Sequence, residues 1–161
     1  MNAATAKKQY WLMKSEPSEI SIDDVLAMPA QKVAWFGVRN YMARNYMRDL
    51  MKIGDPVFFY HSSCAEPGIA GIAEVATKPY PDATQFDARS KYFDATAGIE
   101  NPRWMNVDIR ALRKTRLVSI AELRATAALD DMVILRKGNR LSITPVEADH
   151  WQYITKKLLK N

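Results

Sequence analysis

Aromatic side chains stand beside polar ones at several points of this sequence, a combination that can hold a planar, polar ligand. The groups are Tyr10-Trp11 before Lys14-Ser15-Glu16, Trp35 before Arg39-Asn40-Tyr41, Tyr60 before His61-Ser62, and Trp104 after Asn101-Pro102-Arg103. An aromatic face can stack on a flipped or single-stranded nucleobase, Ser, Asn and Lys can hydrogen-bond its edge, and Arg can meet phosphate. The alternative is that these rings form the core, since aromatic residues dominate any small core.

Groups that could catalyse a reaction are sparse. The sequence contains no phosphate-binding glycine loop and no HExxH, GxSxG or CxxC pattern. One cysteine and two histidines disfavour a closed zinc site, so we expect no metal and no cofactor. His61 and Cys64 are close in sequence, but a Cys–His nucleophile needs a facing geometry that spacing alone does not give. We read His150 as a helix-surface residue and expect no catalytic residue.

The segment RNYM occurs twice, at Arg39–Met42 and at Arg44–Met47. Apolar residues at spacings of four and three predict a helix from about Asn40 to Lys52, with its core stripe formed by Ala43, Met47 and Leu50. Copies five residues apart are rotated by roughly 140° on a helix, so they cannot do the same job. The second copy faces the core and leaves its arginine on the solvent side, whereas the first copy sits at the helix entrance, where a polar ligand can be met.

The other elements must be read from shorter patterns. We expect a first strand at Gln9–Met13, a short helix with a capping box after Ser21, and a long strand over Trp104–Val118. Pro145 or the residues after it open a final helix. Strands of mixed length with scattered helices suggest the α+β class, built round a small barrel or curled sheet.

Length and composition bound the class of protein. A chain of 161 residues, 48% of them hydrophobic and 25% charged, fits one domain with a sizeable core. We expect a disordered tail at residues 1–8 and a single domain at residues 9–158, monomeric in solution. The start lacks the apolar centre of a secretory signal, no apolar run could span a bilayer, and the lone Cys64 fits a reducing compartment. We therefore expect a cytoplasmic protein without membrane contact, or a nuclear one in a eukaryote.

Positive charge is concentrated in the last third of the chain. Residues 103–161 carry 12 basic and 6 acidic side chains, whereas the whole chain has a formal charge of +5. Clustered positive charge attracts phosphate, although many basic proteins never bind nucleic acid. The residues that we expect to contact a nucleic-acid backbone are Arg44, Arg48, Arg110, Arg113, Lys114 and Arg116.

Several ordered blocks of the sequence together resemble the EVE domain family. The blocks are YWLMKSEP at 10–17, GVRNYMARN at 37–45, GDPVFFYHS at 54–62, EPGIAGIAEV at 66–75, YPDATQFD at 80–87, NPRWMNVDI at 101–109 and RLSITPV at 140–146. The resemblance covers about Tyr10 to Ile154. It implies a PUA-like fold, a small mixed β-barrel decorated by helices, and a relation to YTH and ASCH domains.

The resemblance also implies a function and a site. Family members are thought to bind nucleic acid, and several read a modified base in a pocket at the barrel mouth. Carried over by position, the ligand-binding residues are Trp11, Lys14, Ser15, Trp35, Gly37, Val38, Arg39, Asn40, Tyr41, Tyr60, His61, Ser62 and Trp104. Arg39 either serves the backbone or braces the pocket. Phe36 and Met42 depart from the usual acidic residue and Gln, which puts the base preference in doubt.

We therefore expect a module that binds DNA or RNA carrying a methylated or hydroxymethylated base, flipped into an aromatic pocket without chemistry. Two alternatives stay open. The chain could be an enzyme acting on a nucleotide or modified base through His61, Cys64 or Glu16, or it could be a protein-interaction module that uses the basic last third.

Overall fold

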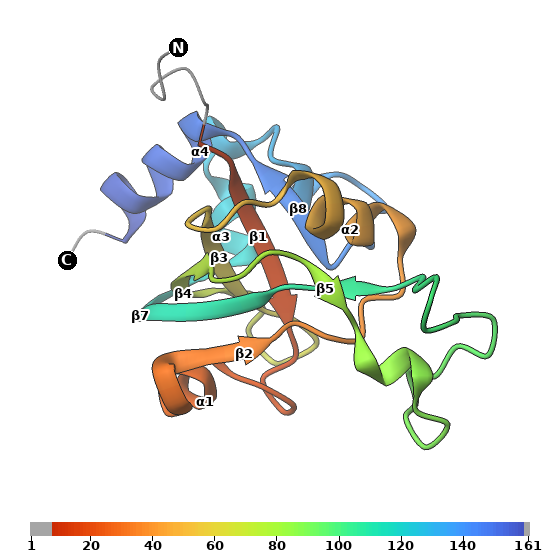
Figure 1. The fold of residues 1–161 in the computed structure, drawn as a ribbon. Helices are drawn as coiled ribbons and strands as arrows, with labels where there is room; N and C mark the ends of the chain where they lie inside the picture. Colours follow the sequence, from red (N-terminus) through yellow and green to blue (C-terminus); the bar gives the residue numbers. More distant parts are fainter. Residues whose placement is uncertain (1–7, 160–161) are drawn as a thin grey trace, which may run out of the picture.

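A six-stranded mixed sheet forms the centre of the computed structural model, which describes residues 8–159 (Figure 1). Its strands are β1 (Tyr10–Ser15), β2 (Lys32–Ala34), β3 (Pro56–His61), β4 (Gly68–Val75), β7 (Asp108–Ser119) and β8 (Ile143–Val146). They lie in the order β2-β7-β4-β3-β1-β8. The β1–β3 pair is parallel and the other pairs are antiparallel. A separate two-stranded sheet joins β5 (Tyr80–Pro81) to β6 (Met105–Asn106).

Short helices connect and cover these strands. The α-helices are α1 (Ile22–Leu26), α2 (Tyr41–Asn45), α3 (Ile120–Ala125) and α4 (Ala148–Tyr153). The 3₁₀ turns are η2 (Pro29–Gln31), η4 (Ala83–Phe86), η5 (Ala127–Leu129) and η6 (Val133–Leu135), and the π-helical turns are η3 (Tyr46–Leu50) and η7 (Ile154–Leu158). None of the helices in residues 8–159 combines the length and the apolar character needed to cross a membrane.

The α+β class is confirmed, but the predicted barrel is not found. Among the described residues the edge strands β2 and β8 each pair with one neighbour and not with each other, so the sheet is open. These edges are three and four residues long, which leaves little ladder with which to close a barrel. Register shifts between Phe59 and Tyr60, and at two points along the β4–β7 pair, still bend the sheet.

Two apolar cores pack on opposite faces of this sheet. Neighbouring residues of β3 alternate between them: Phe59 meets the edge of Trp35 at a centroid distance of 5.6 Å, while Phe58 stacks on Trp151 of α4 at 4.0 Å. Successive side chains of a strand point to opposite faces of the sheet, so β3 contributes buried side chains to both cores. Tyr60 shares the second core with Phe58.

The structure departs from several sequence predictions in detail. The predicted helix at 40–52 is α2 followed by a π-helical turn, in which Met51 N–H donates to the Tyr46 carbonyl at 2.8 Å. Each π-helical turn takes up an extra residue, so the periodic stripe slips. Leu50, predicted in the core, is 45% exposed, and Met51 is buried instead.

The ends of other predicted elements also move. The capping box at Ser21 is confirmed, with Asp24 as its reciprocal partner. The first strand runs two residues further than predicted, to Ser15. The predicted long strand is divided at Val107, because β6 pairs with β5 whereas β7 joins the main sheet. Of the predicted disordered tail, residues 1–7 lie outside the described residues, and Lys8 belongs to no helix or strand.

Candidate functional site

The main cavity of the molecule has a volume of about 700 Å³. This lies inside the ~300–1,000 Å³ range that is usual for small-molecule pockets. It is built where the end of β1, the chain after β2 and the chain after β3 come together. The lining residues are Lys14, Ser15, Glu16, Glu19, Ile20, Val33, Ala34, Trp35, Phe36, Gly37, Val38, Arg39, Ser62, Ser63, Lys91, Tyr92, Arg140 and Ser142.

Only part of the expected ligand-binding set lines this cavity. The expected residues found there are Lys14, Ser15, Trp35, Gly37, Val38, Arg39 and Ser62. The expected residues that lie elsewhere are Trp11, Asn40, Tyr41, Tyr60, His61 and Trp104. Each of these has a partner or a position that explains its absence.

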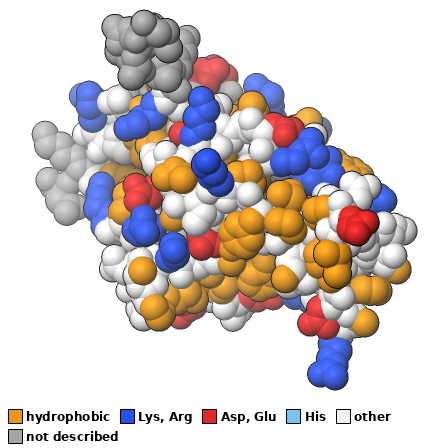
Figure 2. Space-filling view, viewed as in Figure 1, with side chains coloured by type: hydrophobic (Ala, Val, Ile, Leu, Met, Phe, Trp, Pro, Cys, Tyr) orange, Lys and Arg blue, Asp and Glu red, His pale blue; other side chains and the backbone are white. Residues whose placement is uncertain are grey.

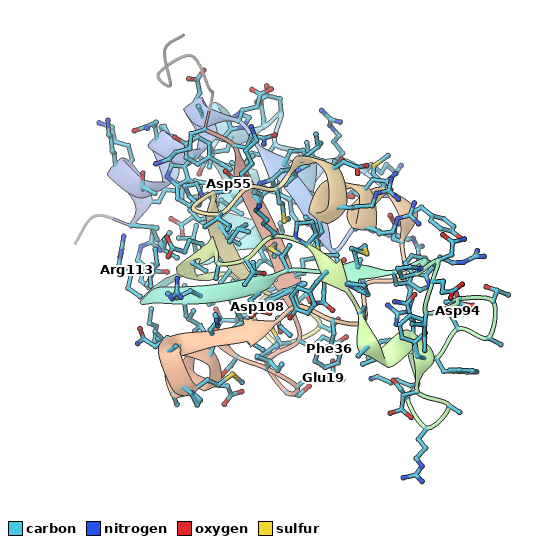
Figure 3. The ribbon with its side chains drawn as sticks, viewed as in Figure 1. Glu19, Phe36, Asp55, Asp94, Asp108 and Arg113 are labelled. Atoms are coloured by element: carbon cyan, nitrogen blue, oxygen red, sulfur yellow. The ribbon has the colours of Figure 1, made fainter. Side chains whose placement is uncertain are left out.

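Trp11, Tyr60 and His61 are held by the sheet and its cores. Trp11 lies three residues before Lys14, the first residue of β1 that lines the cavity, and so roughly 10 Å away along the strand. Its indole N–H donates to buried Asp55 at 3.0 Å, and Figure 3 shows Asp55 well apart from the cavity residues Glu19 and Phe36. Tyr60 points to the opposite face of the sheet from Trp35. His61 Nε2 accepts the Ile22 N–H at 3.1 Å, and burial lowers the pKa of His61.

Asn40, Tyr41 and Trp104 belong to a neighbouring wall. Asn40 is the N-cap of α2, and its Oδ1 accepts the Ala43 N–H at 3.0 Å. Tyr41 stacks on Trp104 with centroids 4.9 Å apart and planes 23° from parallel. Tyr41 lines a second, smaller cavity of about 270 Å³, whose other residues are Arg44, Arg48, Thr96, Asn101, Pro102 and Arg103.

Arg39 is fixed by several hydrogen bonds on the protein side of the cavity wall. Its guanidinium donates to Asp82 Oδ2 at 3.0 Å, to Thr84 Oγ1 at 3.0 Å and to the Tyr92 carbonyl at 2.8 Å. Asp82 is completely buried and also accepts the Gly37 N–H at 2.7 Å. Burial raises the pKa of Asp82, but hydrogen bonds from Thr84, Gly37 and Arg39 outweigh it and leave that pKa below its usual value. This geometry favours the bracing role over a backbone contact for Arg39.

Tyr92 and Phe36 complete the aromatic part of the cavity. The two rings meet edge to face, with centroids 5.9 Å apart. Gly37 has φ of +83°, and a Cβ placed there would lie 2.7 Å from the Tyr92 ring. Sequence reasoning missed Tyr92 because it lies in a long irregular stretch that gives no periodic signal. Phe36 had only the signal of its departure from the family pattern.

Charged groups occupy the rim and floor of the cavity. Lys14 is half-buried and forms no ion pair with any residue in 8–159, and burial lowers its pKa. Lys91 Nζ binds Glu19 Oε1 at 3.0 Å, which joins two lining segments 72 residues apart. Ser15 Oγ donates to the Ile20 carbonyl at 2.6 Å, so this hydroxyl closes the turn beside the cavity. Figure 3 shows Glu19 and Phe36 side by side on one edge of the molecule.

The basic stretch of β7 lies away from both cavities. Arg110 pairs with Glu74 at 3.2 Å, Lys114 with Asp23 at 2.9 Å, and Arg116 with Glu122 at 2.7 Å. Arg113 is exposed, and Figure 3 places it on the side of the view opposite Asp94. Most of the positive charge that the sequence pattern emphasised is therefore matched by nearby carboxylates.

One group of potential metal ligands is present among residues 8–159. Ligand atoms of Asp131, Glu147 and His150 lie within 4.8 Å of one another. His150 Nε2 already bonds Asp131 Oδ1 at 2.7 Å. His150, expected on a helix surface, is buried against the second core, because α4 turns it inward beside Trp151. These residues line neither cavity.

Comparisons with known proteins bear on what the cavities bind. Residues 9–157 match the model of the EVE domain. Human thymocyte nuclear protein 1 is 40% identical, over 90% of this chain and 72% of that protein. A crystal structure from Pseudomonas putida superposes with a TM-score of 0.86 at 44% identity, covering 91% of this chain and 97% of that one.

A further structural relative was crystallised with a ligand. The human THYN1 protein in complex with 5-methylcytosine-containing DNA gives a TM-score of 0.88 at 37% identity, covering 96% of this chain and 99% of that one. The match of nearly the whole chain to one family model, together with relatives of this identity, shows that the chain belongs to the EVE domain family.

Proposed function

We propose that this protein binds DNA and holds one modified base, 5-methylcytosine first among the candidates, flipped into the main cavity. The observation that supports this most strongly is the human relative crystallised with 5-methylcytosine-containing DNA, whose fold matches over 96% of this chain. Modified RNA and hydroxymethylated bases are alternative ligands for the same cavity. No reaction is part of it.

The aromatic part of the cavity would hold the base by its faces. Trp35 is 8% exposed and packs against Phe59, so its ring is rigid. Phe36 and Tyr92 offer ring surface at the mouth. Unstacking a base costs a few kcal/mol, and stacking on an aromatic side chain returns roughly 1–3 kcal/mol. Binding is therefore favourable only if hydrogen bonds at the base edge add to the stacking.

Two residues at the end of β1 suit the edge of cytosine. Cytosine offers an amino donor at N4 and acceptors at N3 and O2. Glu16 can accept from the amino group, and the Lys14 ammonium can donate to an acceptor because it has no carboxylate partner among the described residues. The added methyl group contributes only about 1 kcal/mol when it is buried, so the preference over cytosine should be several-fold rather than absolute.

The geometry gives less support to an enzyme. His61 Nε2, one of the two ring nitrogens that could serve as a base, accepts a backbone N–H from Ile22. Cys64 is a half-buried free thiol. Through the family resemblance we place the chain among PUA-like folds, with a bent, open sheet in place of a closed barrel.

The proposal is tested by fluorescence-polarisation titration of matched duplexes that carry one cytosine, 5-methylcytosine, 5-hydroxymethylcytosine or N6-methyladenine. We expect the tightest binding to the 5-methylcytosine duplex. Glu16→Gln should weaken binding to the 5-methylcytosine duplex, because a neutral amide replaces the carboxylate that accepts from the base amino group.

Glu66→Gln is the matched control, since Glu66 is exposed and lines neither cavity. Equal affinity of the wild-type protein for all four duplexes would contradict base reading. An affinity for the 5-methylcytosine duplex that is the same in Glu16→Gln as in the wild-type protein would move the edge contact to another residue.

A further inference from the structure

The second cavity forms a positively charged groove beside the main one. We propose that this arginine groove (Tyr41, Arg44, Arg48, Thr96, Asn101 and Arg103) binds phosphates of the DNA backbone next to the flipped base. This inference rests on the proposed function. Of the backbone contacts expected from the sequence, it keeps Arg44 and Arg48, adds Arg103 and leaves out the basic stretch of β7.

Arg44 is the central cation of the groove. It donates to the Arg103 carbonyl at 2.9 Å and to Asn45 Oδ1 at 2.8 Å. No carboxylate of residues 8–159 forms an ion pair with it. Burial and the nearby charges of Arg48 and Arg103 lower the pKa of Arg44, which reflects an electrostatic cost in the free protein. A bound anion would offset that cost.

The other two arginines can turn to an anion at little cost. Arg103 donates to Tyr41 Oη at 2.8 Å and approaches Asp94 only to 3.7 Å. Arg48 pairs with Asp49, its neighbour in sequence, through two hydrogen bonds on the surface. Exposed ion pairs contribute about 0–1 kcal/mol, so a phosphate can replace Asp49 as the partner of Arg48. Arg is also the side chain whose planar fork binds phosphate through two donors.

The groove and the main cavity share a wall of stacked side chains. The Arg39 guanidinium carbon lies 5.3 Å from the Trp104 ring centre and 5.4 Å from that of Tyr92. Trp104 carries Tyr41 of the groove on its face, whereas Tyr92 lines the main cavity. A base in the cavity and phosphates in the groove are therefore separated by one layer of side chains, which suits adjacent parts of one strand.

The surface agrees with this placement. Figure 2 shows Lys and Arg side chains gathered over α2, which carries Arg44. By contrast, Arg113 of β7 lies on the opposite side of the view from Asp94, the carboxylate nearest Arg103 (Figure 3). A single DNA strand that enters the main cavity can reach the groove without crossing the sheet to β7.

The salt dependence of DNA binding tests the groove. Each phosphate contact contributes about 0.9 to the slope of log K against log salt concentration. The double variant Arg44→Gln with Arg103→Gln should make that negative slope shallower by about 1–2 on both methylated and unmodified duplexes. The ratio of the two dissociation constants should stay unchanged. Arg113→Gln with Lys114→Gln removes the same charge from β7 and should leave the slope unchanged.

The outcomes separate this inference from the proposed function. An unchanged slope in the groove variant, or an equal fall in the β7 variant, overturns the groove, even where the preference for 5-methylcytosine persists. If the groove variant has a shallower slope but the wild-type protein shows no preference for 5-methylcytosine, the groove is supported and the proposed reading of a modified base is contradicted. If circular dichroism shows that the double variant unfolds, Arg48→Gln, a change at the surface, must still lower the slope. Protection of Arg44 from an arginine-modifying dicarbonyl can be compared between DNA and inorganic phosphate. If phosphate protects Arg44 to the same extent as DNA, the groove is a site for free anions and not for a DNA backbone.

Discussion

At the scale of single residues, Asp82 holds the wall between the two cavities. Its buried carboxylate binds the Gly37 N–H, the Thr84 hydroxyl and the Arg39 guanidinium. Arg39 in turn holds the Tyr92 carbonyl, so one carboxylate fixes two lining segments. Removing one partner of such a buried charge is strongly destabilising, because the charge is then left without full compensation.

We expect Asp82→Asn to destabilise the fold by about 1–3 kcal/mol, because the amide leaves buried donors without an acceptor. The pKa of Asp82 lies below its ordinary value in the folded protein, so its contribution is complete above about pH 4 and is lost as the pH falls through the folded-state pKa. Melting temperatures measured from pH 7 to pH 2 should therefore fall less steeply below pH 4 in the variant. Asp130→Asn, at an exposed position, should keep the wild-type profile; an Asp82→Asn profile parallel to that of the wild type would contradict this account.

Gly37 offers a second test at this scale. Gly37→Ala combines an unfavourable φ of +83° with a Cβ 2.7 Å from the Tyr92 ring, whereas Gly54 has φ of +92° and no atom within 4 Å of its Cβ position. Gly54→Ala should cost about 1 kcal/mol for the backbone alone, and Gly37→Ala should cost more. DNA affinity should fall only for Gly37→Ala, because only that change displaces a cavity residue. Equal losses of stability in the two variants, with DNA affinity unchanged in both, would mean that the Tyr92 ring moves aside freely.

At the scale of elements, the π-helical turn after α2 decides which side chains enter the core. A 3.6-residue period places Leu50 with Met47 on the buried stripe, but the turn buries Met47 and Met51 instead. Arg48 of this turn lines the groove together with Arg44 of α2. One short irregular segment thus contributes both to the core and to the groove.

Alanine substitution distinguishes the two registers. Met47→Ala should destabilise the protein by about 2–5 kcal/mol, because it leaves a cavity in the core. Leu50→Ala should change stability by less than about 0.5 kcal/mol, since the side chain is 45% exposed. Chemical denaturation measures both. A loss of stability in Leu50→Ala as large as that in Met47→Ala would indicate a regular helix with Leu50 in the core.

The elements also show why sequence patterns predicted some features and missed others. The capping box at Ser21 depends on residues three apart, so it could be predicted locally. The slip at Leu50 could not, because periodicity assumes a constant turn. Tyr92 and Arg140 reach the main cavity from segments far along the chain, and only tertiary contacts bring them to Trp35. Trp11 and Tyr60 match the family blocks, yet alternation along the sheet directs them into the cores.

At the scale of the whole molecule, ion pairing changes the meaning of the charge distribution. The last third of the chain carries the excess of basic residues, yet three of those on β7 have carboxylate partners. The arginines around α2 belong to a less basic part of the sequence, and they lie beside the main cavity. The surface that we expect to meet DNA is therefore set by the fold rather than by local composition.

This distribution predicts a modest salt dependence for the wild-type protein. Three arginines in contact with phosphate give a slope of log K against log salt concentration of about −3. Titrations of one duplex at several salt concentrations measure it. A slope steeper than about −5 would show that further basic residues, those of β7 included, join the contact.

The most direct test of the central claim is a crystal structure of this protein with a duplex that carries a single 5-methylcytosine. The account predicts that the methylated base is turned out of the helix, lies in the main cavity against Trp35 and Tyr92, and has its amino group near Glu16. A 5-methylcytosine that stays stacked in the duplex, or a main cavity that holds no base in the complex, would contradict it.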